Sequence, residues 1–423
     1  MPIKSTLELL RALVSIPSVF PNEAKLSRYM QGLLQERGFS VVEVVTEGNR
    51  PNFVATFGEA AGFLAFYGHL DTVPPDPLYA CDPFEMRSDD ANAYGLGVAD
   101  MKGGNACVLS LAFRAAERGL PVKIVFGVDE ENISQGAHDL VSSGHLRDVA
   151  YMFVAEAGQV EDLSQPFSVG FGRKGRVFFE AVVHGASSHA AVATPQSNAI
   201  NRAAAFVALL EGLSFAPHGA LGATRIVPHS ISAGASAFSA PGECVIRFSA
   251  LTTPGITGEH VASLIEERAR EIGLRVDLDT VQRKTPYGEA YEIPVNDPFV
   301  QLVANQVFAP AGVRPCYFSS VADENVFAHR LGIPIITLGP VGTGDHTKDE
   351  RVRISSLDAT VRAYEEIVSL WCEFDSGQRA RCLAKKPAIS PRASADSGDG
   401  TAEPTPFGVA RSGEVRGRSG RGC

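Results

Sequence analysis

The sequence predicts an α/β fold that is interrupted by a smaller α+β domain. Short apolar runs at residues 63–67, 122–128, 151–155 and 333–338 have the length and composition of buried strands, and helical stretches lie between them. Polar residues follow each run, and in open α/β sheets binding sites form beyond the carboxyl ends of strands. The middle of the chain instead shows the alternation of a half-buried sheet.

The start of the chain predicts two amphipathic helices and a strand. Leu7, Leu10 and Val14 recur at helical spacing, and a second set recurs around Met30. Gly38 is expected to end the second helix before a strand at residues 40–45. We expect these elements to be scaffold.

The fragment GHLDTVPP follows the first buried strand and carries the first candidate site residues. His69 and Asp71 are two positions apart, so their side chains leave an extended chain on the same side. A histidine and an aspartate projected together suit a metal ligand and its orienting partner.

The other strand ends carry carboxylates and a second histidine. Two histidines with several carboxylates and no cysteine favour zinc, cobalt or manganese. Acidic residues are also common in turns because turns are polar, and this alternative accounts for the position of any single residue of the set. The ordered set indicates a metal site, and its further members are Asp100, Glu130, Glu131, Glu156 and His346.

Residues 175–285 are predicted to form a separate domain with the order βαββαβ. Metal-ligand motifs lie on both sides of this segment and none lies inside it, as expected of an insertion. The expected divisions are residues 1–174 and 286–375 for the first domain, 175–285 for the insertion and 376–423 for a disordered tail.

The motifs GHLDTVPP, YGLGVADMKGG, DEE, AEAG and GDHTKDE resemble the M20 family of metallopeptidases and deacylases. That family includes succinyl-diaminopimelate desuccinylase, acetylornithine deacetylase and glutamate-releasing carboxypeptidases, and the similarity spans residues 5–372. The resemblance implies a catalytic domain with a mixed, mostly parallel sheet flanked by helices. The inserted α+β domain would be its lid and dimerisation domain.

The resemblance also implies two divalent metal ions, zinc first, with cobalt or manganese as alternatives. His69 and Glu156 would hold the first ion. Glu131 and His346 would hold the second, and Asp100 would bridge the two.

Two further carboxylates would act beside these ions. Asp71 would accept a hydrogen bond from His69 and fix its tautomer. Glu130 resembles the general base, which would take a proton from a metal-bound water and return it to the leaving amine. Neighbouring residues at a strand end point to opposite sides, so Glu131 could face a metal while Glu130 faces that water.

A histidine of the insertion completes the implied catalytic set. His189 lies in a G-x-x-x-H-A pattern whose histidine, in relatives, donates to the developing oxyanion, often from the partner subunit. A homodimer through the lid is therefore expected. The alternative is an ordinary surface histidine, and His184 is expected to be structural.

The insertion departs from the family pattern at two positions. Relatives carry an Asn and an Arg that bind a substrate carboxylate, where this chain has Phe238 and Leu251. Leucine cannot replace a guanidinium fork. Either the substrate is less polar, or another cation acts, with Arg225, Arg247, Arg173 and Lys174 as candidates.

Asp323 follows a small-residue loop that lines the substrate pocket in relatives. Its carboxylate is expected either to meet a cationic substrate group or to cap the helix that follows, since Asp is a good N-cap.

Composition narrows the remaining classes. The 423 residues are 45% hydrophobic, no run reaches eighteen apolar residues and no signal peptide is visible, so no membrane span is expected. Seven scattered cysteines suggest reduced thiols and a cytoplasmic location. The net charge of -10 argues against nucleic acid as a main ligand. The basic tail is expected to be an extension without a partner, and contact with nucleic acid or an acidic surface is the alternative.

These observations predict a dinuclear metal-dependent hydrolase that cleaves the amide bond of an N-acyl amino acid or short peptide. Acetylornithine deacetylase and succinyl-diaminopimelate desuccinylase are the expected types. A carboxypeptidase or carbamoyl-amino-acid hydrolase on the same fold is the alternative. An inactive binding protein is a further one, although every implied ligand and Glu130 are present.

Overall fold

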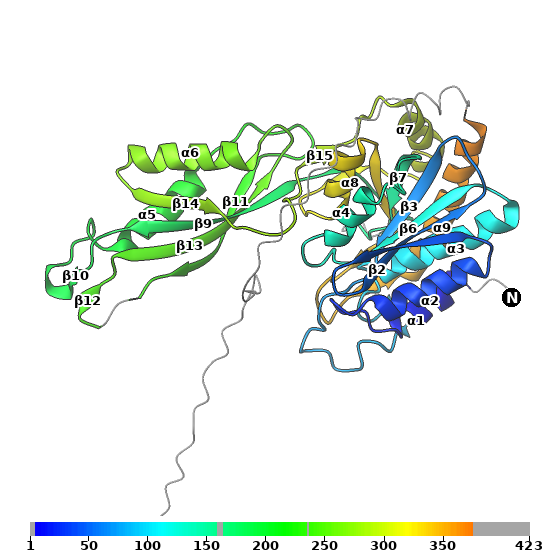
Figure 1. Cartoon of the computed structure of the whole chain (residues 1–423), viewed down its shortest axis with the longest axis horizontal. Coiled ribbons are helices and arrows are strands. Elements are labelled where there is room, and N and C mark those ends of the chain that lie inside the picture. Colours follow the sequence, from blue (N-terminus) through cyan, green and yellow to red (C-terminus); the bar gives the residue numbers. More distant parts are fainter. Residues whose placement is uncertain (1–4, 159–163, 235–236, 375–423) are drawn as a thin grey trace, which may run out of the picture. The chain divides into compact units, whose positions relative to one another are not determined.

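A computed structural model describes residues 5–158, 164–234 and 237–374 of the chain (Figure 1). The predicted disordered tail at residues 376–423 lies outside these described residues. Within them, no helix has both the length and the apolar character needed to cross a membrane.

The largest element is a nine-stranded mixed sheet with the order β1-β2-β6-β3-β7-β17-β8-β15, and β16 also pairs with β8. Its centre, β6-β3-β7-β17, is parallel, and the pairs toward its edges are antiparallel except for β8 with β16. The strands are β1 Ser40–Thr46, β2 Arg50–Phe57, β3 Phe63–His69, β6 Val122–Gly127, β7 Val149–Val154, β8 Ser168–Arg173, β15 Tyr291–Glu292, β16 Cys316–Phe318 and β17 Ile335–Gly339.

The helices around this sheet confirm the predicted α/β architecture. The Ser5 hydroxyl and the Glu8 carboxylate form a capping box that starts the first helix. Inside α3, a side chain at Gly104 would overlap the Ala155 carbonyl oxygen, so glycine lets the helix lie against the end of β7. The helices are α1 Thr6–Val14, α2 Ala24–Gln35, α3 Lys102–Arg118, α4 Gln135–Ser142, α7 Pro298–Val303, η2 Ala304–Phe308, α8 Asp323–Leu331 and α9 Ile354–Glu373.

A small four-stranded sheet brings two loop regions of the chain together. Its order is β18-β19-β5-β4, from β18 Gly342–Thr343, β19 Arg351–Arg353, β5 Asn92–Tyr94 and β4 Arg87–Ser88. The segments that carry Asp100 and His346 therefore leave from the same sheet.

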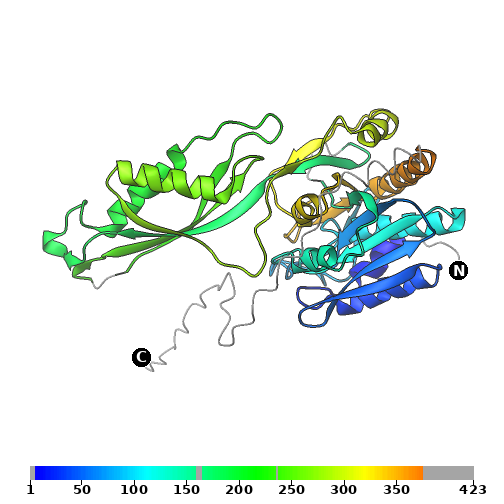
Figure 2. The same ribbon diagram turned by 45° about the horizontal axis from the view of Figure 1, so that its top comes forward.

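The middle of the chain folds into its own antiparallel sheet with the order β11-β13-β9-β14. Two helices lie along one face of this sheet (Figures 1 and 2), and a hydrophobic core separate from the main one fills the space between. The elements follow in the predicted order βαββαβ: β9 Gly175–His184, α5 Ala199–Gly212, β11 Arg225–Ser232, β13 Glu243–Thr252, α6 Gly258–Glu271 and β14 Arg275–Thr280. We call this sheet with its two helices the lid.

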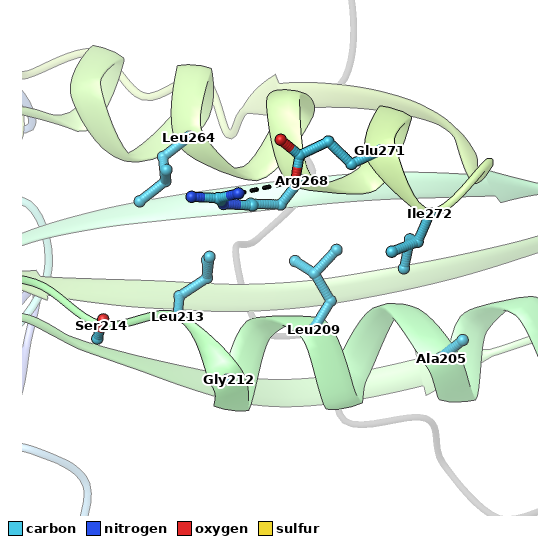
Figure 3. Close-up of a pocket in the computed structure, with 9 residues that line it drawn as sticks. All are labelled: Ala205, Leu209, Gly212, Leu213, Ser214, Leu264, Arg268, Glu271 and Ile272. Carbon is cyan, nitrogen blue, oxygen red and sulfur yellow. Dashed lines mark hydrogen bonds and ion pairs between the residues drawn. The ribbon is translucent and has the colours of Figure 1, made fainter.

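Two smaller features complete the lid. One is a two-stranded ribbon formed by β10 Ser188–His189 and β12 Ser239–Ala240. The short helix η1 Ala190–Val192 follows β10 directly in the chain. A pocket between α5 and α6 is lined mainly by aliphatic side chains such as Leu209 and Leu264, and an ion pair of 2.7 Å joins Arg268 and Glu271 at its edge (Figure 3).

Candidate metal centre

The predicted ligands come together although they lie far apart in the sequence. His69 is the last residue of β3, Glu156 follows β7, and Asp100 stands just before α3. Glu131 lies in the turn after β6, and His346 follows β18. The structure groups their ligand atoms within 4.8 Å of one another in three overlapping sets: His69, Asp100 and Glu156; Asp100, Glu131 and His346; and His69, Glu130 and Glu131.

Asp100 connects two of these sets through its two carboxylate oxygens. One oxygen lies 2.9 Å from His69 Nε2, and the other lies 3.2 Å from His346 Nε2. Around them, Glu156 lies 3.4 Å from His69 Nε2, and Glu131 lies 3.1 Å from His346 Nε2. The Asp100 carboxylate therefore presents one oxygen to each of the two histidines.

The orientation of His69 is fixed by main-chain groups. Its Nδ1 donates to the main-chain carbonyl of Asp71 at 3.0 Å, so Nε2 is the ring nitrogen that faces the carboxylates and that would bind a metal ion. The predicted hydrogen bond to the Asp71 carboxylate is wrong, because that oxygen lies 3.8 Å away. The Asp71 carboxylate instead accepts from the Glu131 main-chain N–H at 2.9 Å, so Asp71 positions both residues.

Glu130 and Glu131 do not continue a strand, contrary to the prediction. β6 ends at Gly127, and the chain turns at Asp129, which has a positive φ of 77°. The alternation argument therefore does not apply, and both carboxylates approach His69. The turn is held by the Asp129 side chain, which accepts from the Gln135 main-chain N–H at 2.8 Å.

A buried ion network behind this turn was not visible in the sequence. Arg50 donates to Asp129 at 2.8 Å and also makes two hydrogen bonds, of 2.8 and 3.0 Å, with Glu23. Each partner lies far from the others in the chain, and no local pattern marks the three as a group.

Glu350 is a second residue that the sequence reasoning missed. Its buried carboxylate accepts from the main-chain N–H groups of Gly97, Ala99 and Asp100 at 2.8, 2.8 and 3.1 Å. It therefore shapes the loop that presents the bridging aspartate. Glu350 ends the GDHTKDE motif, and that position was its only sequence signal.

The charges of the cluster fit a cation. Burial raises the pKa of Glu130 well above its usual range, and it raises the pKa of Glu156 to about 7 with help from the charge of Asp100. Hydrogen bonds with Asp100 and Glu131 raise the pKa of His346 to about 11. Several carboxylates this close repel one another, so the oxygen and nitrogen donors suit one or more divalent ions.

Asp323 does not cap α8, so that interpretation is wrong. The N-cap is Ala322, whose main-chain N–H donates to Asn325 at 3.0 Å. The buried Asp323 carboxylate instead accepts from the Tyr67 hydroxyl, and burial raises its pKa to about 7.

His189 is placed apart from the ligand groups, none of which includes it among the described residues. It pairs with Ser239 across the β10-β12 ribbon, and its ring accepts from the Ala191 main-chain N–H at 3.1 Å. Phe238 lies next to this ribbon with 74% of its surface exposed. The role of His189 therefore remains a prediction.

Comparisons with known proteins agree with the motifs. A family model described as peptidase family M20/M25/M40 matches residues 65–370. Two curated succinyl-diaminopimelate desuccinylases, one from Methylorubrum populi and one from Methylorubrum extorquens, are each 28% identical. Both alignments cover 87% of this chain, with 98% and 99% of the relatives.

Solved structures share the fold. A tripeptidase of Staphylococcus aureus subsp. aureus Mu50 has a TM-score of 0.70 at 20% identity, over 87% of this chain and 98% of that one. A dinuclear metal binding peptidase of the M20 family from Bacillus subtilis has a TM-score of 0.66 at 17% identity, over 88% and 98%. The family match and the fold confirm the predicted resemblance: the chain belongs to peptidase family M20/M25/M40 and is a metal-dependent hydrolase.

Proposed function

We propose that this protein is a dinuclear deacylase that hydrolyses the amide bond of an N-acyl amino acid. The observation that carries the proposal is the placement of Asp100, whose two oxygens face two different histidines. Curated relatives named succinyl-diaminopimelate desuccinylase support the substrate class.

The residues that would hold the ions divide into two sets. His69 and Glu156 would hold one, Glu131 and His346 the other, and Asp100 would contact both. Zinc is the first expectation, with cobalt or manganese as alternatives, because the donors are imidazole and carboxylate. When bound, the ions would polarise the scissile carbonyl and make an attacking water more acidic.

Glu130 is the proposed general base. Its carboxylate lies within the group that includes His69 and Glu131, so it borders the place where a substrate carbonyl would meet the ions. Burial raises its pKa, and a base works best when its pKa is near the working pH. It would take the proton of the attacking water and pass it to the leaving amine.

His189 would donate to the oxyanion from a second subunit. The exposed apolar side chains beside it, Phe238 at 74% and Val192 at 69%, are large for a surface that remains in water. A homodimer that covers them and brings His189 to the partner's ions accounts for both features.

The test is hydrolysis by the full chain, loaded with zinc, cobalt or manganese, of N-succinyl, N-acetyl, N-formyl and N-carbamoyl amino acids and dipeptides. Release of amine from one acyl class, with about two ions bound per chain, supports the proposal. Cleavage of dipeptides or of carbamoyl substrates alone would identify the carboxypeptidase or carbamoyl-hydrolase reaction instead. One bound ion per active chain would contradict the dinuclear arrangement.

A further inference from the structure

Leu251 stands where relatives carry a carboxylate-binding arginine, and its neighbours are two other arginines. Strand β13 lies between β9 and β11, and the register places Leu251 directly opposite Arg176 on one side and Arg225 on the other. Side chains directly opposed across strands lie about 5 Å apart at their Cβ atoms and share a face. Either guanidinium is therefore close enough to reach the position that an arginine side chain at residue 251 would occupy.

The face that carries these three residues is the one away from the lid helices. The next pair in the register, Val177 with Ala250, and the pair Phe179 with Phe248 belong to the lid core or pack against it under α5 and α6. Because side chains alternate along a strand, Arg176 and Leu251 point to the opposite face.

The other candidate cations are either paired or solvated. Arg173 makes a buried ion pair of 2.8 Å with Glu324, and Arg247 makes a solvent-exposed ion pair of 2.7 Å with Glu180. Lys174 donates to the Ala223 carbonyl at 2.6 Å. Arg225 lies exposed on the edge strand, where water solvates its charge.

Arg176 differs from all of these. It is partly buried, its Nε is fully enclosed, and within the described residues no protein acceptor receives a hydrogen bond from its guanidinium. The side chain lies near the Phe178 ring, whose centre is 5.9 Å from the guanidinium carbon. A buried charge without a partner is costly, and the structure elsewhere pairs such groups, as Arg50 shows with two carboxylates.

The main chain holds Arg176 in place at the root of the lid. Its N–H donates to the Gly288 carbonyl at 3.0 Å, and Asn325 donates to the Lys174 carbonyl just before it at 3.0 Å. Burial lowers the pKa of Arg176, and the charge of Glu130 acts in the opposite direction. The guanidinium is thus within electrostatic reach of the proposed base.

We infer that Arg176 is the cation that binds a carboxylate of the substrate in this chain, in place of the guanidinium that Leu251 lacks. The inference rests on the proposed function. The carboxylate has two possible sources, the far end of a dicarboxylic acyl group or the α-carboxylate of the amino acid. Both have the same chemistry, an anion that accepts two parallel N–H groups of an arginine.

The experiment compares matched substrates in wild type, Arg176→Ala and Arg176→Lys. One pair is an N-succinyl and an N-butyryl amino acid, which differ in the acyl carboxylate. The other is an N-acetyl amino acid and the N-acetyl amine without the α-carboxylate. In Arg176→Ala, KM for the substrate whose carboxylate is bound should rise roughly 10- to 100-fold. The KM for the matched substrate that lacks this carboxylate should change little. In Arg176→Lys, the KM for the carboxylate substrate should rise less than in Arg176→Ala.

Two further variants exclude a merely structural effect. Arg225 lies on the other side of Leu251 and is exposed, so Arg225→Ala should leave the preference for the carboxylate substrate unchanged. Adding Leu251→Arg to Arg176→Ala should recover the carboxylate preference. An unchanged preference in both Arg176 variants would overturn the inference while leaving the proposed hydrolase intact.

Binding separates this inference from the proposed function. If wild type hydrolyses nothing, the proposed function fails, and calorimetric titration with the N-succinyl and N-butyryl pair and the N-acetyl pair still tests Arg176. A preference for the carboxylate that is lost in Arg176→Ala supports the inference. Equal affinities in wild type and variant, or no affinity in either, would overturn it.

Discussion

The ends of the central strands and the free face of the lid sheet differ in how their charges are compensated. At the strand ends, His69 and Asp100 contact each other, and the buried carboxylates of Asp71 and Glu350 accept from the main-chain N–H groups of Glu131 and Asp100. On the lid face, the Arg176 guanidinium lacks an acceptor among the described residues, and the residue opposite it is the neutral Leu251. The motifs that carry the family resemblance lie around the first region, and none lies on the second.

This difference separates chemistry from selectivity. A site that holds cations needs every ligand at once, so the strand ends tolerate little change. On a sheet face that binds one end of a substrate, a cationic residue on the neighbouring strand can reach the same position as one on the original strand. We expect changes at the strand ends to reduce turnover and changes on the lid face to alter which substrate is used.

The largest expected effect comes from Glu130. Glu130→Gln removes the proton acceptor and should lower kcat by roughly 10²- to 10⁴-fold. Metal content should stay near that of wild type, measured by mass spectrometry of the purified protein. Glu131→Gln is the matched neighbour and should lose metal instead. A loss of metal from both variants would mean that the two adjacent residues do not have separate roles.

His189→Ala tests whether the lid also takes part in turnover. Loss of an oxyanion donor should lower kcat by roughly 10²- to 10³-fold with metal retained. His260→Ala, which removes an exposed histidine of α6, is the control and should be silent.

Mixing two inactive variants shows which subunit supplies the histidine. In a mixed dimer of His189→Ala and Glu130→Gln, one site would combine an intact Glu130 with the partner's intact histidine. Recovery of activity after mixing supports donation between subunits. No recovery from dimers shown to have exchanged would place His189 over its own subunit's ions.

A smaller effect is expected at Glu350, which touches no reacting group. Glu350→Ala leaves the N–H groups of Gly97, Ala99 and Asp100 without their acceptor, and metal affinity should fall roughly 10- to 100-fold. Competition with a metal chelator measures this. Asp349→Asn is the control, because the Asp349 carboxylate pairs with the exposed Lys348 and its loss should leave affinity unchanged.

The smallest effect is on stability and lies outside both regions. Burial, followed by the charges of Arg330 and Arg283, lowers the pKa of His138 to about 4 from its ordinary 6.5. The unfolded chain binds a proton on His138 more readily than the folded one. The contribution of His138 to the free energy of unfolding is therefore fully present above pH 6.5 and is lost as pH falls toward 4. Urea midpoints at pH 7 and pH 5 should differ less in His138→Gln than in wild type. His145 is exposed and serves as the control. An equally reduced difference between the two urea midpoints in His145→Gln would contradict the assignment of the effect to His138.

The sequence predicted the positions of the ligands better than the contacts around them. Ordered motifs located His69, Asp100 and His346. The common edge of the parallel strands explains the place of His69, whereas Asp100 and His346 are presented by the small antiparallel sheet. The acceptor for His69 was wrong, since a main-chain carbonyl and a carboxylate two residues away cannot be told apart from sequence. Glu350 and Arg50 were missed because their partners come from distant segments.

In the lid, the strand-like and helix-like residue patterns predicted the order of strands and helices. Its register could not be predicted, since register depends on which strands pair and where their bulges lie. Arg176 was therefore absent from the cations considered on sequence grounds, although it lies directly opposite Leu251.

The network of Glu23, Arg50 and Asp129 bears on how far the functional unit extends toward the N-terminus. The family model begins to match at residue 65, and every proposed ligand lies beyond that point. Yet Asp129, which precedes the proposed base, is held by an arginine of β2, and that arginine is held by a glutamate next to α2. A protein trimmed to the matched residues would keep all its ligands and lose the anchor of the turn that presents two of them.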